Sequence, residues 1–282
     1  MNYRHAFHAG NFADVFKHVV ITRILIHLRE KSTPFRVIDT HAGAGLYDLF
    51  GPESIRSGEW RGGIGRLMDV TLSAGVRALL APYLDTIMSF NPSAGLRRYP
   101  GSPVLALNFM RPQDRLIACE LEPNAAASLV RELQPERRAK VATIDGWIGL
   151  NAYVPPKERR GLVIIDPPYE ERDEFVRAAS SIERAHRKWR TGCFMLWYPI
   201  KARSDPDRLA KRMRCAGMAK VLRAELLLMA PHPDRLTGAG LIIIGPPWTL
   251  ESELGRLLPE LASALGQAPG SGFTLDWLAG EK

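Results

Sequence analysis

Short apolar runs recur along the chain, and most are followed by a polar or Gly/Pro-rich turn and then by a stretch with helical spacing. Apolar runs of roughly four to eight residues bounded by such turns are typical of buried β-strands. This pattern predicts strands at Phe35–Thr40, Arg115–Leu121, Lys140–Ile144, Leu162–Ile165, Cys193–Trp197, Leu222–Met229 and Leu241–Ile244.

The segments between the runs predict how the strands are connected. The first five runs alternate with helical patterns, which favours parallel strands joined by right-handed crossovers. The last two runs are joined by Ala230–Gly240, which is rich in Pro and Gly and too short for a crossover helix. A hairpin is therefore expected there, with the last strand antiparallel. The pattern predicts an α/β fold with a seven-stranded, doubly wound sheet.

Two segments fall outside this alternation. Asp14–Lys31 carries apolar residues at helical spacing on one side, which predicts an amphipathic helix. The stretch 46–112 is too long for a simple link between strands and contains further helical patterns at Gly75–Met88 and Pro103–Met110. We expect a small helical insert subdomain over residues 51–99, with the main α/β domain formed by residues 1–50 and 100–282.

Composition narrows the class of protein and its partners. The 282 residues are 46% hydrophobic and 24% charged, which is ordinary globular composition. No apolar run approaches the roughly 20 residues that a membrane span needs, and the N-terminus lacks a signal pattern, so we expect a cytoplasmic protein without membrane contact. The net charge of +8 favours a polyanionic partner, although any single basic cluster is more often a solvated helix face.

The clearest candidate for chemistry is the tetrapeptide Asp166-Pro167-Pro168-Tyr169, which follows the apolar run Leu162–Ile165. Ligands of open α/β sheets bind beyond the carboxyl ends of the strands. An exocyclic amine is a poor nucleophile, and the Asp166 carboxylate and Pro167 carbonyl can accept its N–H bonds and orient it. Tyr169 can stack against a flipped base. The same tetrapeptide can also be a turn that simply ends a strand.

Polar residues and glycines follow the other predicted strands too. The turn Asp39–Gly45 contains His41 and Gly43, where small residues let the backbone approach a cofactor. Glu120 ends the second run and can accept both hydroxyls of a ribose. Two further groups are Asp145-Gly146, whose carboxylate can bind the adenine amino group of a cofactor, and Ser102, which opens a helix that can hold a carboxylate. Each has an ordinary structural explanation alone, but together they indicate a nucleoside cofactor.

At these residues the chain resembles a class I methyltransferase with a Rossmann-like fold. The opening residues Tyr3–Asn11 and Asp14–His18 resemble the start of the RlmJ family of 23S rRNA adenine-N6 methyltransferases. Three further motifs resemble that family as well, at Thr40–Gly45, Tyr99–Pro103 and Trp197–Ile200. The resemblance covers nearly the whole chain.

The resemblance implies a monomeric, S-adenosylmethionine-dependent enzyme that methylates N6 of one adenine in protein-poor or naked 23S rRNA. It implies that Asp166 is the catalytic acceptor and that Tyr3 contacts the substrate. It implies cofactor contacts at His18, His41, Ser102, Glu120, Asp145, Gly146 and Asp166. The roles of His18 and Tyr3 rest on the resemblance alone.

Three other functions remain open at this stage. A DNA adenine-N6 or cytosine-N4 methyltransferase uses the same tetrapeptide, although such an enzyme often needs a larger recognition domain. A nicotinamide-dependent dehydrogenase predicts an acid about 20 residues after the glycine turn, and Glu120 lies much further along. A non-catalytic RNA-binding protein can keep a methyltransferase fold. No metal site is expected, because Cys-x-x-Cys pairs are absent and His5, His8 and His18 have no evident ligand partner nearby in sequence.

Overall fold

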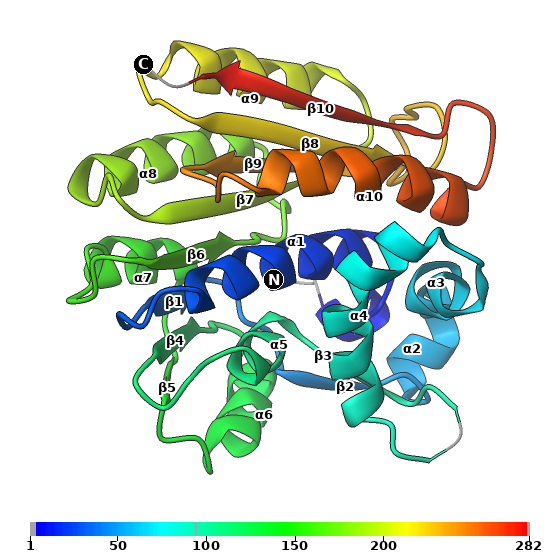
Figure 1. Ribbon diagram of the computed structural model, residues 1–282, viewed down its shortest axis with the longest axis horizontal. Helices are drawn as coiled ribbons and strands as arrows, with labels where there is room; N and C mark the ends of the chain where they lie inside the picture. Colours follow the sequence, from blue (N-terminus) through cyan, green and yellow to red (C-terminus); the bar gives the residue numbers. More distant parts are fainter. Residues whose placement is uncertain (1–3, 94, 281–282) are drawn as a thin grey trace.

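The computed structural model describes residues 4–93 and 95–280, and a single large sheet organises them (Figure 1). Its strand order is β10-β8-β9-β7-β6-β1-β4-β5. The bounds of these strands are β1 Arg36–Asp39, β4 Arg115–Cys119, β5 Ala139–Ala142, β6 Gly161–Ile165, β7 Cys193–Ile200, β8 Val221–Leu227, β9 Gly238–Ile244 and β10 Gly272–Ala279.

The directions of the strands confirm the predicted connections. Strands β5, β4, β1, β6 and β7 run parallel to one another, whereas β9 lies between β7 and β8 and is antiparallel to both. The expected count of seven strands is wrong, because β10 adds an eighth, antiparallel to β8. The apolar runs did not predict this edge strand, because only Leu278 within it is buried and the strand contains no continuous apolar run. A cross-strand ion pair between Arg223 and Asp276, at 2.7 Å, stabilises its register.

Helices cover both faces of the sheet. Helices α1 (Phe12–Arg29), α5 (Ser102–Asn108), α6 (Pro123–Leu133) and α10 (Leu250–Leu265) contribute to one apolar core. Helices α7 (Gly146–Tyr153), α8 (Glu174–Lys188) and α9 (Ser204–Cys215) form a second core on the opposite face. The fold is therefore a doubly wound α/β sheet, and every parallel strand ends at one common edge, here called the carboxyl edge.

Residues 46–100 form a small unit beyond that edge. Strands β2 (Leu46–Asp48) and β3 (Arg98–Pro100) pair antiparallel and bring its two ends together. Between them lie α2 (Pro52–Ser57), the π-helical η2 (Arg61–Gly65), α3 (Arg66–Asp69) and α4 (Ala74–Ser89), grouped at one side of Figure 1. Their helical character agrees with the sequence pattern, whereas the proposed division into domains at residues 51–99 stays a prediction.

Helix α1 is buried on nearly every side, so the expectation of an amphipathic helix is wrong. Asn11 caps its start by accepting hydrogen bonds from the backbone N–H groups of Ala13 and Asp14, both at 3.0 Å. One side of α1 packs toward the sheet, and η2, α4 and α10 cover other sides. Because of this cover, the charged residues Asp14 and Lys17 lie inside the protein. No helix within residues 4–93 and 95–280 is long and apolar enough to cross a membrane.

Candidate active site

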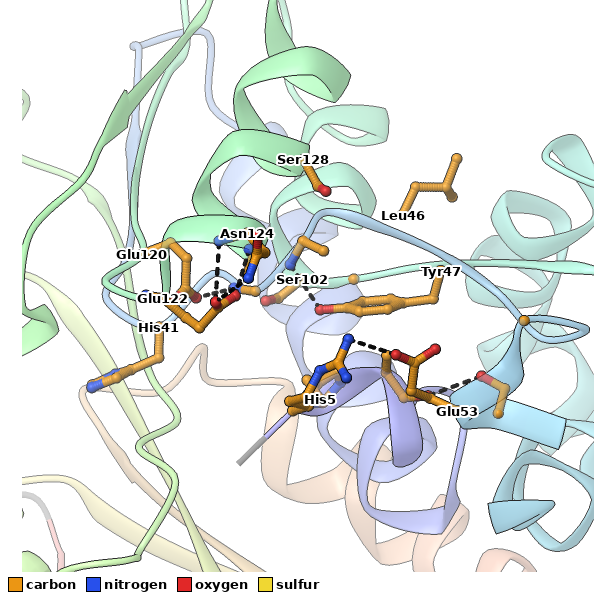
Figure 2. A pocket seen from close by; sticks show the side chains of 18 of the residues that line it. His5, His41, Leu46, Tyr47, Glu53, Ser102, Glu120, Glu122, Asn124 and Ser128 are labelled. Carbon is orange, nitrogen blue, oxygen red and sulfur yellow. Dashed lines mark hydrogen bonds and ion pairs between the residues drawn. The ribbon is translucent and has the colours of Figure 1, made fainter. Parts of the chain in front are cut away.

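A cavity of about 480 Å³ lies at the carboxyl edge and gathers most of the predicted site residues (Figure 2). We call it the carboxyl-edge cavity. Its lining includes the predicted residues His18, His41, Gly43, Ser102, Glu120 and Asp166. Pro168 also lines it, whereas Asp145, Gly146, Pro167 and Tyr169 do not. Tyr3 lies outside the described residues.

The glycine turn and Glu120 form one end of this cavity. One carboxylate oxygen of Glu120 accepts a hydrogen bond from the Gly43 N–H at 2.8 Å, and the other accepts one from the Glu122 N–H at 2.8 Å. Gly43 has a φ of +65°, and a Cβ there would lie 2.1 Å from the Tyr47 hydroxyl. Glycine is therefore required at this position, both by the backbone conformation and by the close approach of Tyr47. Figure 2 shows Glu120 and His41 toward one end, with Tyr47 and Glu53 toward the other.

Ser102 lies between these ends, at the start of α5. Gly101, rather than Ser102, is the N-cap residue of this helix. Next to Ser102 lies Asp39, the last residue of β1, whose side chain is completely buried. Burial raises the pKa of Asp39 to about 6, and a hydrogen bond from Ser102 offsets part of that shift. Asp39 also accepts a hydrogen bond from the His41 N–H at 3.3 Å, but its side chain does not line the cavity.

The most unexpected feature is a buried charge network around Lys17. Its ammonium group forms ion pairs with Asp14, at 2.9 Å, and with Asp166. Burial by itself would lower the pKa of Lys17, but the two carboxylates together hold it above its usual value, so the group stays charged. Lys17 thus fixes one oxygen of Asp166. Sequence reasoning missed Lys17 and Asp14, although a lysine within an otherwise apolar helix was a usable signal.

Two histidines near the N-terminus, His5 and His18, have hydrogen-bond partners in or beside this network. Asp14 accepts a hydrogen bond from His5 at 2.9 Å, a partner that the sequence analysis did not identify. His18 pairs with the Tyr99 hydroxyl at 2.8 Å, and burial lowers its pKa to about 3. His18 is therefore neutral, and its Nε2 has no hydrogen-bond partner among the described residues. These contacts depend on chain folding that local sequence does not reveal.

The Asp-Pro-Pro-Tyr tetrapeptide follows β6, as predicted, and its residues lie in two different environments. Asp166 and Pro168 line the cavity, whereas the Tyr169 ring packs against Phe175 and Trp197, with centroids 4.6 and 5.8 Å away. Tyr169 has a φ of +52°, and its hydroxyl donates to the Trp197 carbonyl at 2.8 Å. An aromatic cluster therefore adjoins the carboxylate.

Asp145 and Gly146 do not line the cavity, and Gly146 packs against His41, which does. Asp145 caps α7 by accepting hydrogen bonds from the Trp147 and Ile148 N–H groups at 2.9 and 3.0 Å. A Cβ on Gly146 would lie 2.2 Å from the Thr40 carbonyl oxygen and 2.6 Å from Nε2 of His41. The absence of a side chain at Gly146 is thus what lets the turn after β1 pack against α7.

Fold and site together define the class of protein. The protein has the features of a methyltransferase: an α/β sheet with an antiparallel β9, a glycine turn after β1, an acid after β4 and Asp-Pro-Pro-Tyr after β6. Residues 32–279 match the family model described as "Ribosomal RNA large subunit methyltransferase D, RlmJ". The chain therefore belongs to this family of enzymes, as the resemblance in its motifs implied.

Full-length relatives agree with this assignment. The chain is 40% identical over 283 residues to Ribosomal RNA large subunit methyltransferase J of Escherichia coli K12 and 38% identical to the protein of that name from Haemophilus influenzae, with 100% of each chain covered. A crystal structure of protein LPL1258 from Legionella pneumophila shares the fold with a TM-score of 0.85 and 36% identity, covering 95% of this chain and 98% of that one.

Proposed function

We propose that this protein transfers a methyl group from S-adenosylmethionine to N6 of an adenine in 23S rRNA. The observation that carries the proposal is the position of Asp166, whose carboxylate lies on the cavity wall and is held there by the buried Lys17. The names of the relatives in Escherichia coli and Haemophilus influenzae support ribosomal RNA as the substrate.

The residues present fit the proposed cofactor. The cavity volume of about 480 Å³ lies within the range of small-molecule sites, roughly 300–1,000 Å³. Glu120 would bind the ribose hydroxyls, while Ser102 and the unpaired Nε2 of His18 would hold the methionine end. When bound, the cofactor supplies an electrophilic methyl group on a sulfonium.

The chain's own groups prepare the nucleophile. Lys17 occupies one oxygen of Asp166, so the other oxygen and the Pro167 carbonyl are left to accept the two N–H bonds of the adenine amine. Their hydrogen bonds orient the amine and favour a lone pair directed at the methyl group. Asp166 then accepts the proton that the methylated nitrogen releases. In this scheme Tyr169 stacks on the base, and Lys17 is a positioning residue.

The test is transfer of tritiated methyl from S-adenosylmethionine to protein-free 23S rRNA that lacks the modification. Digestion to nucleosides would identify the product. We expect label in N6-methyladenosine, and a decrease of about 10²–10⁴-fold in Asp166→Ala with cofactor binding retained. Asp173→Ala is the matched control, since Asp173 is an exposed acid outside the cavity lining. Label only in DNA or only in another nucleoside would contradict the proposal, and so would an Asp166→Ala variant as active as wild type.

A further inference from the structure

A second cavity, of about 500 Å³, lies at the edge of the sheet opposite to Asp166. Its lining includes Gly161 and Cys193, where β6 and β7 begin, and Gly245, which follows the end of the antiparallel β9. Strand β10 also ends on this side of the sheet (Figure 1). We call this cavity the amino-edge pocket. It includes the Pro246-Pro247-Trp248 segment, which the proposed methyl transfer does not use.

Two tryptophans give this pocket an exposed aromatic surface. The Trp248 side chain is 83% exposed, the highest value for a large hydrophobic residue in the described part of the chain, and Trp277 is 37% exposed. The buried Pro247, whose own φ is fixed by its ring, directly precedes Trp248. An accessible indole face beside a cavity is a surface on which a planar ring can stack.

The lysine and arginine side chains of the lining are positively charged. Lys31, Arg160 and Lys220 line the amino-edge pocket, and no aspartate or glutamate of residues 4–93 and 95–280 does so. Arg160 donates to neutral acceptors rather than to a carboxylate, namely the Leu28 carbonyl at 2.9 Å and the Thr33 carbonyl at 3.3 Å. Burial and the nearby Arg111 lower the pKa of Arg160, while Asp114 and Glu30 act in the opposite direction.

One acid lies close in sequence without lining the pocket. Glu30 forms an ion pair with His27, at 3.2 Å, and its side chain is 58% exposed. Glu30 therefore lies beside the pocket, where it offsets part of the positive charge at Arg160. The pocket as a whole combines an aromatic face with cations, which is the combination that binds single-stranded nucleic acid.

We propose that the amino-edge pocket binds a nucleotide of single-stranded RNA, with its base on Trp248 and its phosphate near Lys31 and Arg160. This inference rests on the proposed function only in taking RNA as the substrate. Because the pocket and Asp166 lie at opposite edges of the sheet, the bound nucleotide belongs to a part of the RNA other than the target adenine. The site would increase affinity for a long RNA without taking part in methyl transfer.

The test uses the full-length chain and a fluorescently labelled oligoadenylate of about 12 nucleotides, with binding followed by anisotropy at several salt concentrations. Stacking on one aromatic side chain contributes about 1–3 kcal/mol per base, so we expect Trp248→Ala to weaken binding about tenfold. Lys31→Glu should weaken binding and make its salt dependence shallower by about one phosphate contact. Lys211→Glu, on an exposed lysine of α9 outside both cavities, is the charge-matched control.

Ultraviolet cross-linking of the same oligonucleotide should yield a labelled peptide that contains Trp248. The inference is wrong if Trp248→Ala binds as tightly as wild type, or if Lys211→Glu weakens binding as much as Lys31→Glu, since net charge alone would then explain the effect. Methyl transfer to 23S rRNA by the wild-type protein is measured separately. Its absence would overturn the proposed function, whereas unchanged binding by the variants would overturn only the assignment of this pocket.

Discussion

The carboxyl-edge cavity and the amino-edge pocket have nearly the same volume, about 480 and 500 Å³. They differ in whether their charged side chains are buried and paired. In the first, Lys17, Asp14 and Asp166 are paired and largely removed from water. In the second, Lys31 is exposed and no carboxylate of the described residues lines the wall. Buried pairs have fixed geometry and strong local fields, which chemistry requires, whereas hydrated cations suit phosphate binding. Cavity size therefore says less about function than the burial of charge.

Strand direction explains why the two edges differ. Parallel strands place the residues after β1, β4 and β6 at one edge, and three of those residues are Gly43, Glu120 and Asp166. The antiparallel β9 ends at the other edge and brings Trp248 there. One reversed strand thus separates the Asp-Pro-Pro-Tyr segment from the similar Pro246-Pro247 segment.

The largest effect is expected from Lys17→Met, which leaves two carboxylates without their cation. Removing one partner of a buried ion pair destabilises a protein by about 3–5 kcal/mol, and a displaced Asp166 carboxylate should reduce methyl transfer by about 10²-fold. Lys31→Met, at the amino edge, should change stability by no more than about 0.5 kcal/mol. Urea unfolding and the methyl-transfer assay measure both. Equal stability of the two variants would remove the proposed contrast between the edges.

Asp39→Asn tests the buried carboxylate at the end of β1. Burial raises the pKa of Asp39 to about 6, above its unfolded value near 3.8, so the folded state binds the proton more tightly. The contribution of Asp39 to wild-type stability is therefore greatest below pH 4 and is lost as the pH rises to about 6, by as much as about 3 kcal/mol.

The asparagine variant lacks this titration. Its free energy of unfolding relative to wild type should increase between pH 4 and 6 and then level off, as urea unfolding at a series of pH values would show. A difference that does not vary with pH would mean that Asp39 is not a destabilising buried charge.

Gly146→Ala tests the packing behind His41. The new Cβ would lie 2.2 Å from the Thr40 carbonyl oxygen, and overpacking of this kind costs about 1–3 kcal/mol. Gly272→Ala is the control, because nothing lies within 4 Å of its Cβ position. Calorimetry with S-adenosylmethionine adds a second readout. A loss of affinity would indicate that the displaced turn contributes to the cofactor site, and a stability equal to that of Gly272→Ala would contradict the close packing.

The smallest effect on stability is expected from Trp248→Ala. Replacing such an exposed side chain should change the free energy of unfolding by no more than about 0.5 kcal/mol. Trp189→Ala, which leaves a cavity at a buried position, should cost about 3–5 kcal/mol. Thermal unfolding of both variants measures the difference. A large loss of stability in Trp248→Ala would mean that this tryptophan is structural and would weaken its assignment to RNA binding.

Most of the sheet was predictable, because buried parallel strands are local apolar runs bounded by turns. All seven predicted strands are present, and the reversed β9 followed from a connection too short for a helix. Strand β10 was not predicted, since an edge strand with one buried residue has no apolar run. The burial of α1 was also missed, because its cover comes from η2, α4 and α10, which are distant in sequence.

The sequence alone determined which residues follow the ends of the parallel strands, and so placed Gly43, Glu120 and Asp166 at one edge. That information is local, because strand length and turn chemistry are encoded by adjacent residues. Only the tertiary structure decided that Lys17 would hold Asp166 and that Trp248 would be exposed beside Lys31 and Arg160. Pairing and exposure depend on which distant segments exclude water from a side chain, and no local pattern records that.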